Sequence, residues 1–180
     1  MADTTADLAL PAALAEVAGI GFEWEYDEET DEDRGCDFQL YPQFEAPDRT
    51  AWWWRLWTGN PGVDGGEFRF FGTTGAGDYT GFWLTRPGAE ITGQPVVHIG
   101  SEGERDVIAR DLGDLLWLFA AGLGPGEAAN DPGASAEPNE AFRAIAERYA
   151  PGRGRPPAEI VAAAQEEFPH FSDLIDGMCR

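Results

Sequence analysis

Three short apolar segments separated by glycine-rich turns most constrain what this chain can fold into. They are Glu67–Phe71, Asp78–Leu84 and Pro95–Ile99, joined by GTTGAG and by TRPGAEITGQ. Runs of this length that are rich in aromatic and β-branched residues are typical of strands, and short turns between them favour antiparallel neighbours. The sequence therefore predicts a meander within a mostly antiparallel, twisted sheet of about four to six strands.

Amphipathic segments around these strands predict helices. Leu8–Ala18 is rich in Ala and Leu, and Asp106–Ala121 carries its apolar residues on one face. A further helix is expected to begin with Asp48 as its N-cap and to end at Gly59. Together with the strands, these segments predict an α+β fold with helices packed on one side of the sheet.

The helix that begins at Asp48 contains the sequence AWWWRLW. At 100° per residue, Trp52, Trp53, Leu56 and Trp57 fall within an arc of roughly 140°. These four residues are therefore predicted to face the core. Trp54 falls outside the arc and is predicted to be exposed, where an aromatic side chain can anchor a protein partner.

The end of the chain differs in composition from the rest. The segment Gly122–Asn139 is rich in Gly, Pro and Ala and is typical of a linker. The sequence therefore predicts an α+β domain over residues 1–122, a linker over 123–139 and a helical extension over 140–180. The helices expected in the extension are Glu140–Tyr149, Ala158–Phe168 and Phe171–Met178.

The stretch FEWEYDEETDED, residues 22–33, combines a strand pattern with a run of acids. Phe22, Trp24 and Tyr26 alternate with glutamates, which predicts a strand with buried aromatic residues. Cys36–Tyr41 alternates again and is predicted to be its partner strand, so the two would form a hairpin with a long acidic loop. The acids of this run are Asp27, Glu28, Glu29, Asp31, Glu32 and Asp33.

This acidic run does not match a calcium-binding loop. The glycine of an EF-hand would fall on Glu32 and its bidentate glutamate on Phe38. The sequence therefore predicts no cofactor and no specific metal site, although weak binding of divalent cations by proximity of charge stays open. A solvated loop and a surface for a basic partner are the two remaining interpretations.

The charge of the chain limits its partners. The net charge is −21, from 33 acids and 12 bases, and every base is an arginine. Binding to nucleic acid or to anionic membranes depends on clustered cations and is therefore not expected. A basic protein partner is favoured. With no signal peptide recognised and two widely spaced cysteines, we expect reduced thiols and a cytoplasmic location.

Catalytic signatures are scarce. The absence of lysine excludes a Walker A lysine, a lysine Schiff base and a Ser–Lys pair. His98 lies in a predicted strand and is interpreted as structural, while His170 lies near Glu166 and Glu167 at a predicted helix end. The sequence therefore predicts a protein that is not an enzyme, with a hydrolase using carboxylates and one of these histidines as the alternative.

Between about residues 37 and 122 the chain resembles the SUKH superfamily, whose fold is shared by a yeast cell-wall-synthesis regulator and many bacterial immunity proteins. The resemblance rests on FRFFGTTGAGDYTGFWL, PVVHIGSEGE and VIARDLGDLLWLFAAG, in that order. TAWWWRLWTGNP also looks like the Trp-rich segment of some bacterial members. The motif positions with an expected structural role are Gly72, Gly75, Gly77, Asp78, Trp83 and Trp117.

The resemblance implies an α+β domain without catalytic residues that binds and neutralises a toxin. The toxin would be a nuclease or deaminase domain from a polymorphic or contact-dependent system of bacteria. A regulatory or scaffold protein of the same fold is the alternative. Because nucleases are basic, the residues expected to contact the partner are the acidic run and Trp54, namely Asp27, Glu28, Glu29, Asp31, Glu32, Asp33 and Trp54.

Overall fold

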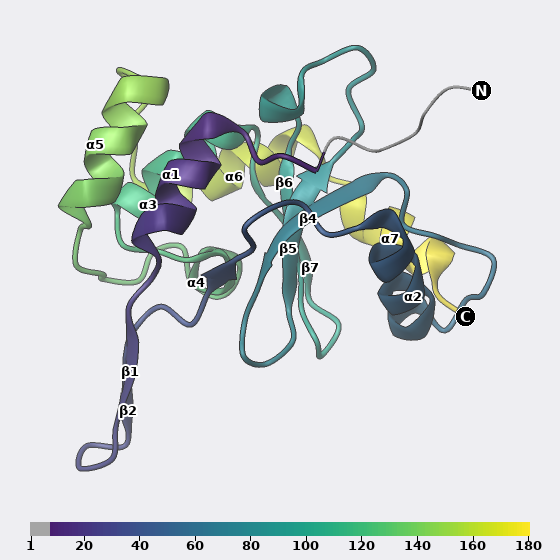
Figure 1. The fold of residues 1–180 in the computed structure, drawn as a ribbon, viewed down its shortest axis with the longest axis horizontal. Helices are drawn as coiled ribbons and strands as arrows, with labels where there is room; N and C mark the ends of the chain where they lie inside the picture. The colour runs from purple at the N-terminus through teal and green to yellow at the C-terminus, as the bar shows by residue number, and fades with distance from the viewer. Residues whose placement is uncertain (1–7) are drawn as a thin grey trace.

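A five-stranded antiparallel sheet in the order β3-β4-β5-β6-β7 forms the centre of the computed structural model (Figure 1). The structure describes residues 8–180, without the side chains of Glu32 and Asp33; residues 1–7, on which the expected lack of a signal peptide partly rests, lie outside it. The predicted meander is confirmed as three consecutive strands, β4 to β6. The strands are β3 Gln39–Leu40, β4 Phe68–Thr73, β5 Tyr79–Trp83, β6 Val96–Ile99 and β7 Arg105–Ala109.

Helices surround this sheet and confirm the α+β class. In the described part of the chain, none of them is long and apolar enough to cross a membrane. They are α1 Ala12–Ile20, α2 Pro47–Thr58, α3 Leu112–Ala120, α4 Pro125–Asn130, α5 Glu140–Tyr149, α6 Pro157–Glu167 and α7 Phe171–Met178, with a short 3₁₀ turn, η1, at Ile91–Gly93.

The helices cover both faces of the sheet and not one face as predicted. Val96 belongs to a core cluster shared with α1, α3 and α5, whereas the next residue, Val97, belongs to a second cluster shared with α2 and α7. Successive side chains of a strand point to opposite faces, and all four residues of β6 are buried. A run such as PVVHI, which is apolar except for His98, is typical of a strand buried on both sides.

The helix predicted over residues 106–121 is wrong in its first part. Arg105–Ala109 forms strand β7, which pairs with β6, and α3 begins only at Leu112. Asp111 is its N-cap, and the carboxylate of Asp111 accepts a hydrogen bond of 3.0 Å from the amide of Asp114. Long-range pairing with β6 therefore overrides the apparent helical period.

The segment predicted as a linker contains helix α4, and Ala128 of this helix is buried in the same cluster as α1 and α3. The predicted extension also shares the core of the sheet. Phe142 of α5 joins the first cluster, and Phe171 of α7 joins the second. The bounds predicted for α5 and α7 are confirmed, and the division into domains stays a prediction.

A buried ionic group also joins the C-terminal segment to α3. Asp114 is fully buried and accepts hydrogen bonds from Arg110 at 2.8 Å and from Arg153 at 2.7 Å. A buried carboxylate needs such partners because burial removes its hydration. Arg153 lies in the loop before α6, so this contact fixes that loop against α3.

The positions on which the predicted resemblance rests lie in the sheet, its turns and the helix that follows it. At Gly72 in β4, a Cβ atom would lie 2.3 Å from the ring of Phe38, so only glycine fits there. Gly75 and Gly77 lie in the turn between β4 and β5. Trp83 packs against Phe171 of α7, and the indole of Trp117 donates a hydrogen bond to the loop that follows α5.

The tryptophans of α2 face the sheet differently from the prediction. Trp54, predicted to be exposed, is fully buried and stacks on Trp57, with ring centroids 5.4 Å apart. Trp52 and Leu56, predicted to be buried, are 59% and 68% exposed. Apolar residues occur around most of the circumference of this helix, so the helical period alone could not identify the buried arc. Helix α2 ends as predicted at Gly59, but its N-cap is Ala46 and not Asp48.

We predict that Trp54→Ala lowers the free energy of unfolding by about 3–5 kcal/mol, because it leaves a large cavity in the second core cluster. Trp52→Ala, on the same helix, should change it by less than about 0.5 kcal/mol. Urea denaturation of the two variants checks this pair. Equal losses of stability would show that the orientation of α2 is wrong.

Candidate functional site

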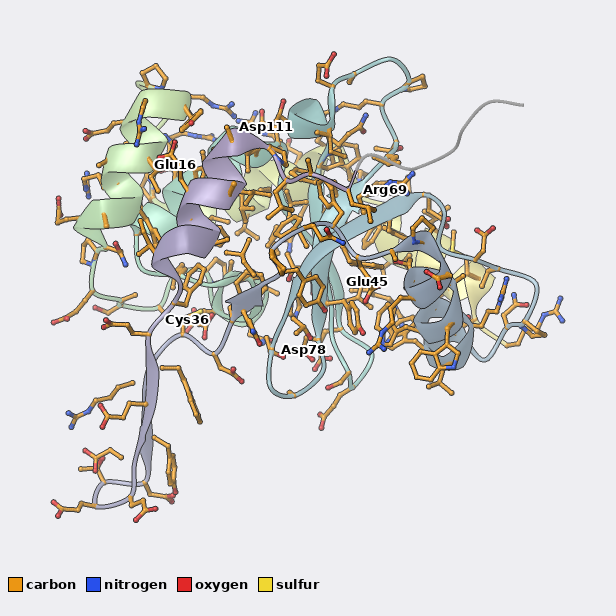
Figure 2. The ribbon with its side chains drawn as sticks, viewed as in Figure 1. Glu16, Cys36, Glu45, Arg69, Asp78 and Asp111 are labelled. Atoms are coloured by element: carbon orange, nitrogen blue, oxygen red, sulfur yellow. The ribbon has the colours of Figure 1, made fainter. Side chains whose placement is uncertain are left out.

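A separate two-stranded ribbon projects from the body of the molecule (Figure 1). Strand β1, Trp24–Asp27, pairs antiparallel with β2, Glu32–Gly35. The turn between them closes with a hydrogen bond of 2.9 Å from the amide of Asp31 to the carbonyl of Asp27. Figure 2 shows Cys36 at the root of the ribbon, which carries side chains on both sides beyond that point.

The ribbon differs from the predicted hairpin in two ways. The strand that pairs with β1 is β2, which begins at the end of the acidic run, and not Cys36–Tyr41. The predicted burial of the aromatic residues is also wrong, because Trp24 is 51% exposed and Tyr26 is 47% exposed. Only Phe22, which precedes β1, packs inward, at 5.0 Å from the ring of Phe119.

Gly35 separates the ribbon from the body. It has a positive φ of 86°, and a Cβ atom there would lie 2.0 Å from the carbonyl oxygen of Glu23. Only glycine tolerates this combination. The chain can therefore turn from β2 into the buried residue Cys36 within one step.

The predicted contact acids lie along the turn and the strands of the ribbon. Asp27 is half-buried and forms an ion pair of 2.9 Å with Arg34. The carboxylate of Asp31 accepts a hydrogen bond from the hydroxyl of Tyr26. Glu28 and Glu29 are exposed in the turn, and Glu32 and Asp33 lie in β2. The acids are therefore carried by a defined ribbon and not by one long loop.

The register of the ribbon gives it two different faces. Trp24 and Tyr26 alternate with Glu25 and Asp27, so aromatic and acidic side chains point to opposite sides. Arg34 lies directly opposite Glu25, on the acidic side. Strand β1 thus carries its two exposed aromatic residues on one side and the carboxylates of Glu25 and Asp27 on the other.

The predicted aromatic anchor, Trp54, cannot contact a partner because the core encloses it. The aromatic side chains that the structure exposes on the ribbon are Trp24 and Tyr26, and sequence reasoning assigned both to the core. One sequence signal indicates that these two residues are exposed. Acids occupy the positions between the aromatic residues of β1 and also the positions that follow this strand. A hairpin of this composition is expected to stay exposed to water.

His98 lies in the sheet interior. The side chain of His98 is buried, with Nε2 at 3.8 Å from the carboxylate of Asp78 and Nδ1 at 3.4 Å from the hydroxyl of Thr80. Burial lowers the pKa of His98, although Asp78 and Asp106 act in the opposite direction. His98 is therefore neutral at pH 7 and forms part of the core.

Asp78 connects two turns at the edge of this region. Burial acts to raise its pKa, but hydrogen bonds from the amide of Ser101, at 2.8 Å, and from the hydroxyl of Thr74, at 2.9 Å, lower it overall. The ionised carboxylate of Asp78 thus holds the β4–β5 turn against the β6–β7 turn. Asp78 thus has a structural role in this chain.

The hydrolase alternative requires a cavity in which a histidine meets carboxylates. A cavity of about 360 Å³ is lined by Asp37, Asp78, Glu127 and Asp131, but His98 does not line it. The other histidine, His170, is exposed on the surface. Within residues 8–180, apart from the side chains of the two β2 acids, no group of three or more His, Cys, Asp or Glu residues could hold a metal ion.

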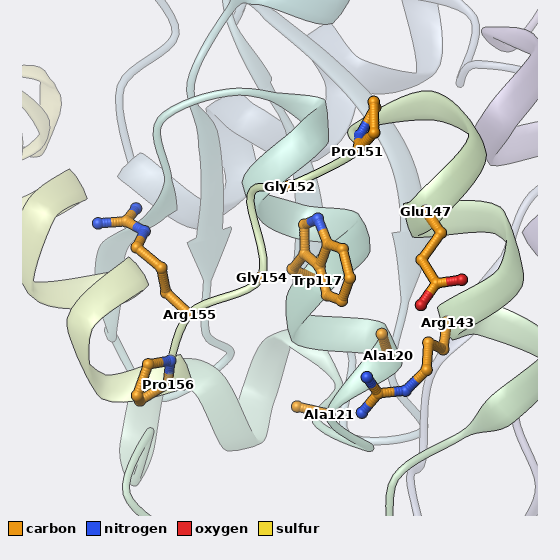
Figure 3. A pocket seen from close by; sticks show the side chains of 10 residues that line it. All are labelled: Trp117, Ala120, Ala121, Arg143, Glu147, Pro151, Gly152, Gly154, Arg155 and Pro156. Carbon is orange, nitrogen blue, oxygen red and sulfur yellow. The ribbon is translucent and has the colours of Figure 1, made fainter.

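A second cavity, of about 590 Å³, lies between α3, α5 and the loop before α6 (Figure 3). Trp117 forms its centre, with Arg143 and Glu147 on one side. The guanidinium of Arg155 points away from Trp117 and lies 3.6 Å from the carboxylate of Asp114. The polar groups of this cavity therefore do not converge on one point where a ligand atom would sit.

The cysteines are reduced in the structure, as free thiols. Burial raises the pKa of the Cys36 thiol, and the neighbouring carboxylate of Glu127 raises it further. A thiol in this state is a poor nucleophile. Cys36 therefore packs the core at the root of the ribbon.

Comparison with known proteins finds no match among family models, curated proteins or solved structures. The resemblance to the SUKH superfamily thus stays a prediction. The exposed ribbon is the feature of the described chain that most requires a functional explanation, because it carries two exposed aromatic residues, Trp24 and Tyr26, among many acids and outside the body of the molecule.

We predict that the stability of the protein depends on the protonation of His98. Its pKa in the folded state is lowered below the value of about 6.5 in the unfolded chain. The neutral form of His98 contributes fully to the free energy of unfolding above the pKa of the unfolded chain. This contribution is lost as the pH falls from there through the folded-state pKa, with a slope of at most about 1.4 kcal/mol per pH unit.

Urea denaturation of the wild type and of His98→Gln, between pH 7.5 and pH 5.0, measures this loss. The variant should lack the component of the slope that is due to His98. Glu45 and Asp106, whose pKa values are raised by burial, contribute slopes of the opposite sign in both proteins. Parallel curves for the two proteins would show that His98 does not titrate in this way.

Proposed function

We propose that this chain is an acidic protein-binding domain whose ribbon β1–β2 binds a basic protein. The observation that carries the proposal is the exposure of Trp24 and Tyr26 on a ribbon with eight acidic residues between positions 23 and 33. Aromatic side chains supply much of the free energy of protein interfaces. The carboxylates add long-range attraction for a positively charged partner.

We further propose that the partner is a toxin and that the domain is an immunity protein. The support is the resemblance to the SUKH superfamily together with the charge of −21. A nuclease needs a cationic surface to hold nucleic acid, and an acidic ribbon is complementary to such a surface. On this proposal the domain acts in the cytoplasm without catalysis, because binding alone blocks the active site of the toxin.

Genetic context provides the first experiment. The protein should capture the product of the adjacent gene in a pull-down, and its co-expression should restore growth of cells that produce this toxin. Capture of a non-toxic protein would favour the regulatory alternative. Absence of growth rescue, with the complex formed, would contradict the role in immunity.

Charge on the ribbon should control the rate of association. The variant Glu23→Gln, Glu25→Gln, Glu28→Gln, Glu29→Gln removes four exposed carboxylates. We expect its association rate constant with the partner to fall about tenfold or more at low salt, with a weaker dependence on ionic strength. Stopped-flow measurements over a range of salt concentrations check this.

A matched control removes the same number of charges elsewhere. Glu90, Glu102, Glu159 and Glu166 are exposed and lie outside the ribbon, so their replacement by glutamine produces the same net charge. The association rate constant of this control variant with the partner should stay close to that of the wild type. Equal effects of the two variants would show that total charge, and not the ribbon, attracts the partner.

The aromatic face should control the lifetime of the complex. Trp24→Ala is expected to raise Kd about tenfold or more, mainly through faster dissociation. Trp52→Ala is the control, because Trp52 has a similar exposure, 59% against 51%, and lies on α2. Surface plasmon resonance measures both variants, and an unchanged dissociation rate for Trp24→Ala would exclude Trp24 from the interface.

A further inference from the structure

The main chain of β1 has a free hydrogen-bonding edge at Trp24. In an antiparallel pair, residues alternate between those that bond across the pair and those whose N–H and C=O point outward. The amide of Cys36 donates a hydrogen bond of 2.9 Å to the carbonyl of Glu23, which sets this alternation. Glu23 and Glu25 therefore bond towards β2, and the N–H and C=O of Trp24 point away from it.

No described strand lies along this outer edge. The ribbon contains only β1 and β2, and the five-stranded sheet does not continue into it. A two-stranded ribbon without a packed face is only marginally stable in water, and a third strand stabilises it. An exposed edge with an exposed aromatic residue is thus a template for a strand from another chain.

The charge of the ribbon decides which strand it accepts. A second copy of this chain would bring eight further acids against the same eight, with Arg34 as the one base between positions 22 and 35 of each copy. Opposed like charges on neighbouring strands destabilise their pairing. The edge therefore selects against self-association and in favour of a cationic segment.

We propose that the basic partner adds a β-strand to the outer edge of β1. This inference rests on the proposed function and specifies how the partner is recognised. The added strand carries Lys or Arg at alternate positions, on the side of Glu23, Glu25 and Asp27. It carries an apolar residue on the opposite side, next to Trp24. Main-chain hydrogen bonds supply part of the affinity, and the side chains supply the choice of partner.

Proline at position 24 tests the main-chain contact. Trp24 is the first residue of β1, a position where proline is tolerated, and its outward N–H is not used by β2. Both Trp24→Pro and Trp24→Ala lose the indole, but only Trp24→Pro loses the N–H. Strand addition predicts that Trp24→Pro binds the captured partner about fivefold or more weakly than Trp24→Ala does.

Equal affinities of these two variants would overturn the inference, provided that the amide signals of Glu25 and Arg34 show an intact ribbon. Glu25→Pro is the control for a broken ribbon, because the N–H of Glu25 points towards β2. A second measurement does not depend on any variant. Amide exchange by NMR should be fast for Trp24 in the free protein and at least about tenfold slower in the complex.

A short synthetic peptide of alternating lysine and valine serves as a probe of defined sequence. Binding of this peptide should shift the amide signals of β1. Two further versions of the peptide carry N-methyl groups on the valine amides or on the lysine amides. The version whose methyl groups face the edge of β1 should cause no shifts. Shifts that survive both methylations, or a Trp24 amide that exchanges equally fast in the complex, would refute strand addition. The proposed function fails separately, if the ribbon charge variant binds the captured partner like its control.

Discussion

Burial of both faces of the five-stranded sheet is the constraint on which the rest of this structure depends. Every residue of β6 is buried, so the chain has to supply two separate layers of helix. Helices α1, α3 and α5 provide one layer, and α2 and α7 provide the other. The C-terminal helices are therefore needed to complete the core, and α6 contributes to both clusters beside the edge strand β7.

The sequence predicts correctly those helices and strands whose apolar pattern and end residues agree with their packing in the structure. Strands β4 to β6 follow apolar runs with glycine turns, and α5 has Asn139 at its N-cap and an amphipathic pattern. It fails for Arg105–Ala109, because pairing with β6 is a long-range interaction that no local window contains. It also fails for α2, where tryptophans on several sides of the helix leave its rotation to the shape of the sheet.

The candidate site shows the same division between local and long-range information. The acids are visible in the sequence, and their exposure follows from mutual repulsion. The burial of Trp54 depends on which surface lies opposite, which no local pattern contains, and the only local signal for the exposure of Trp24 was the acids around it. Trp54 meets Phe68 and Phe70 of the sheet, whereas Trp24 lies opposite a glycine, Gly35, which has no side chain to cover it.

The separation of the ribbon from the core has a consequence for how this protein can change over generations. The described side chains of β1 and β2 belong to neither core cluster, so their substitution carries little penalty in folding, except at Gly35, where only glycine fits. Gly35 and Cys36 hold the ribbon in place independently of its charges. Substitutions that alter the surface of the ribbon can therefore accumulate one at a time. The sheet and its two layers of helices stay under separate selection for packing.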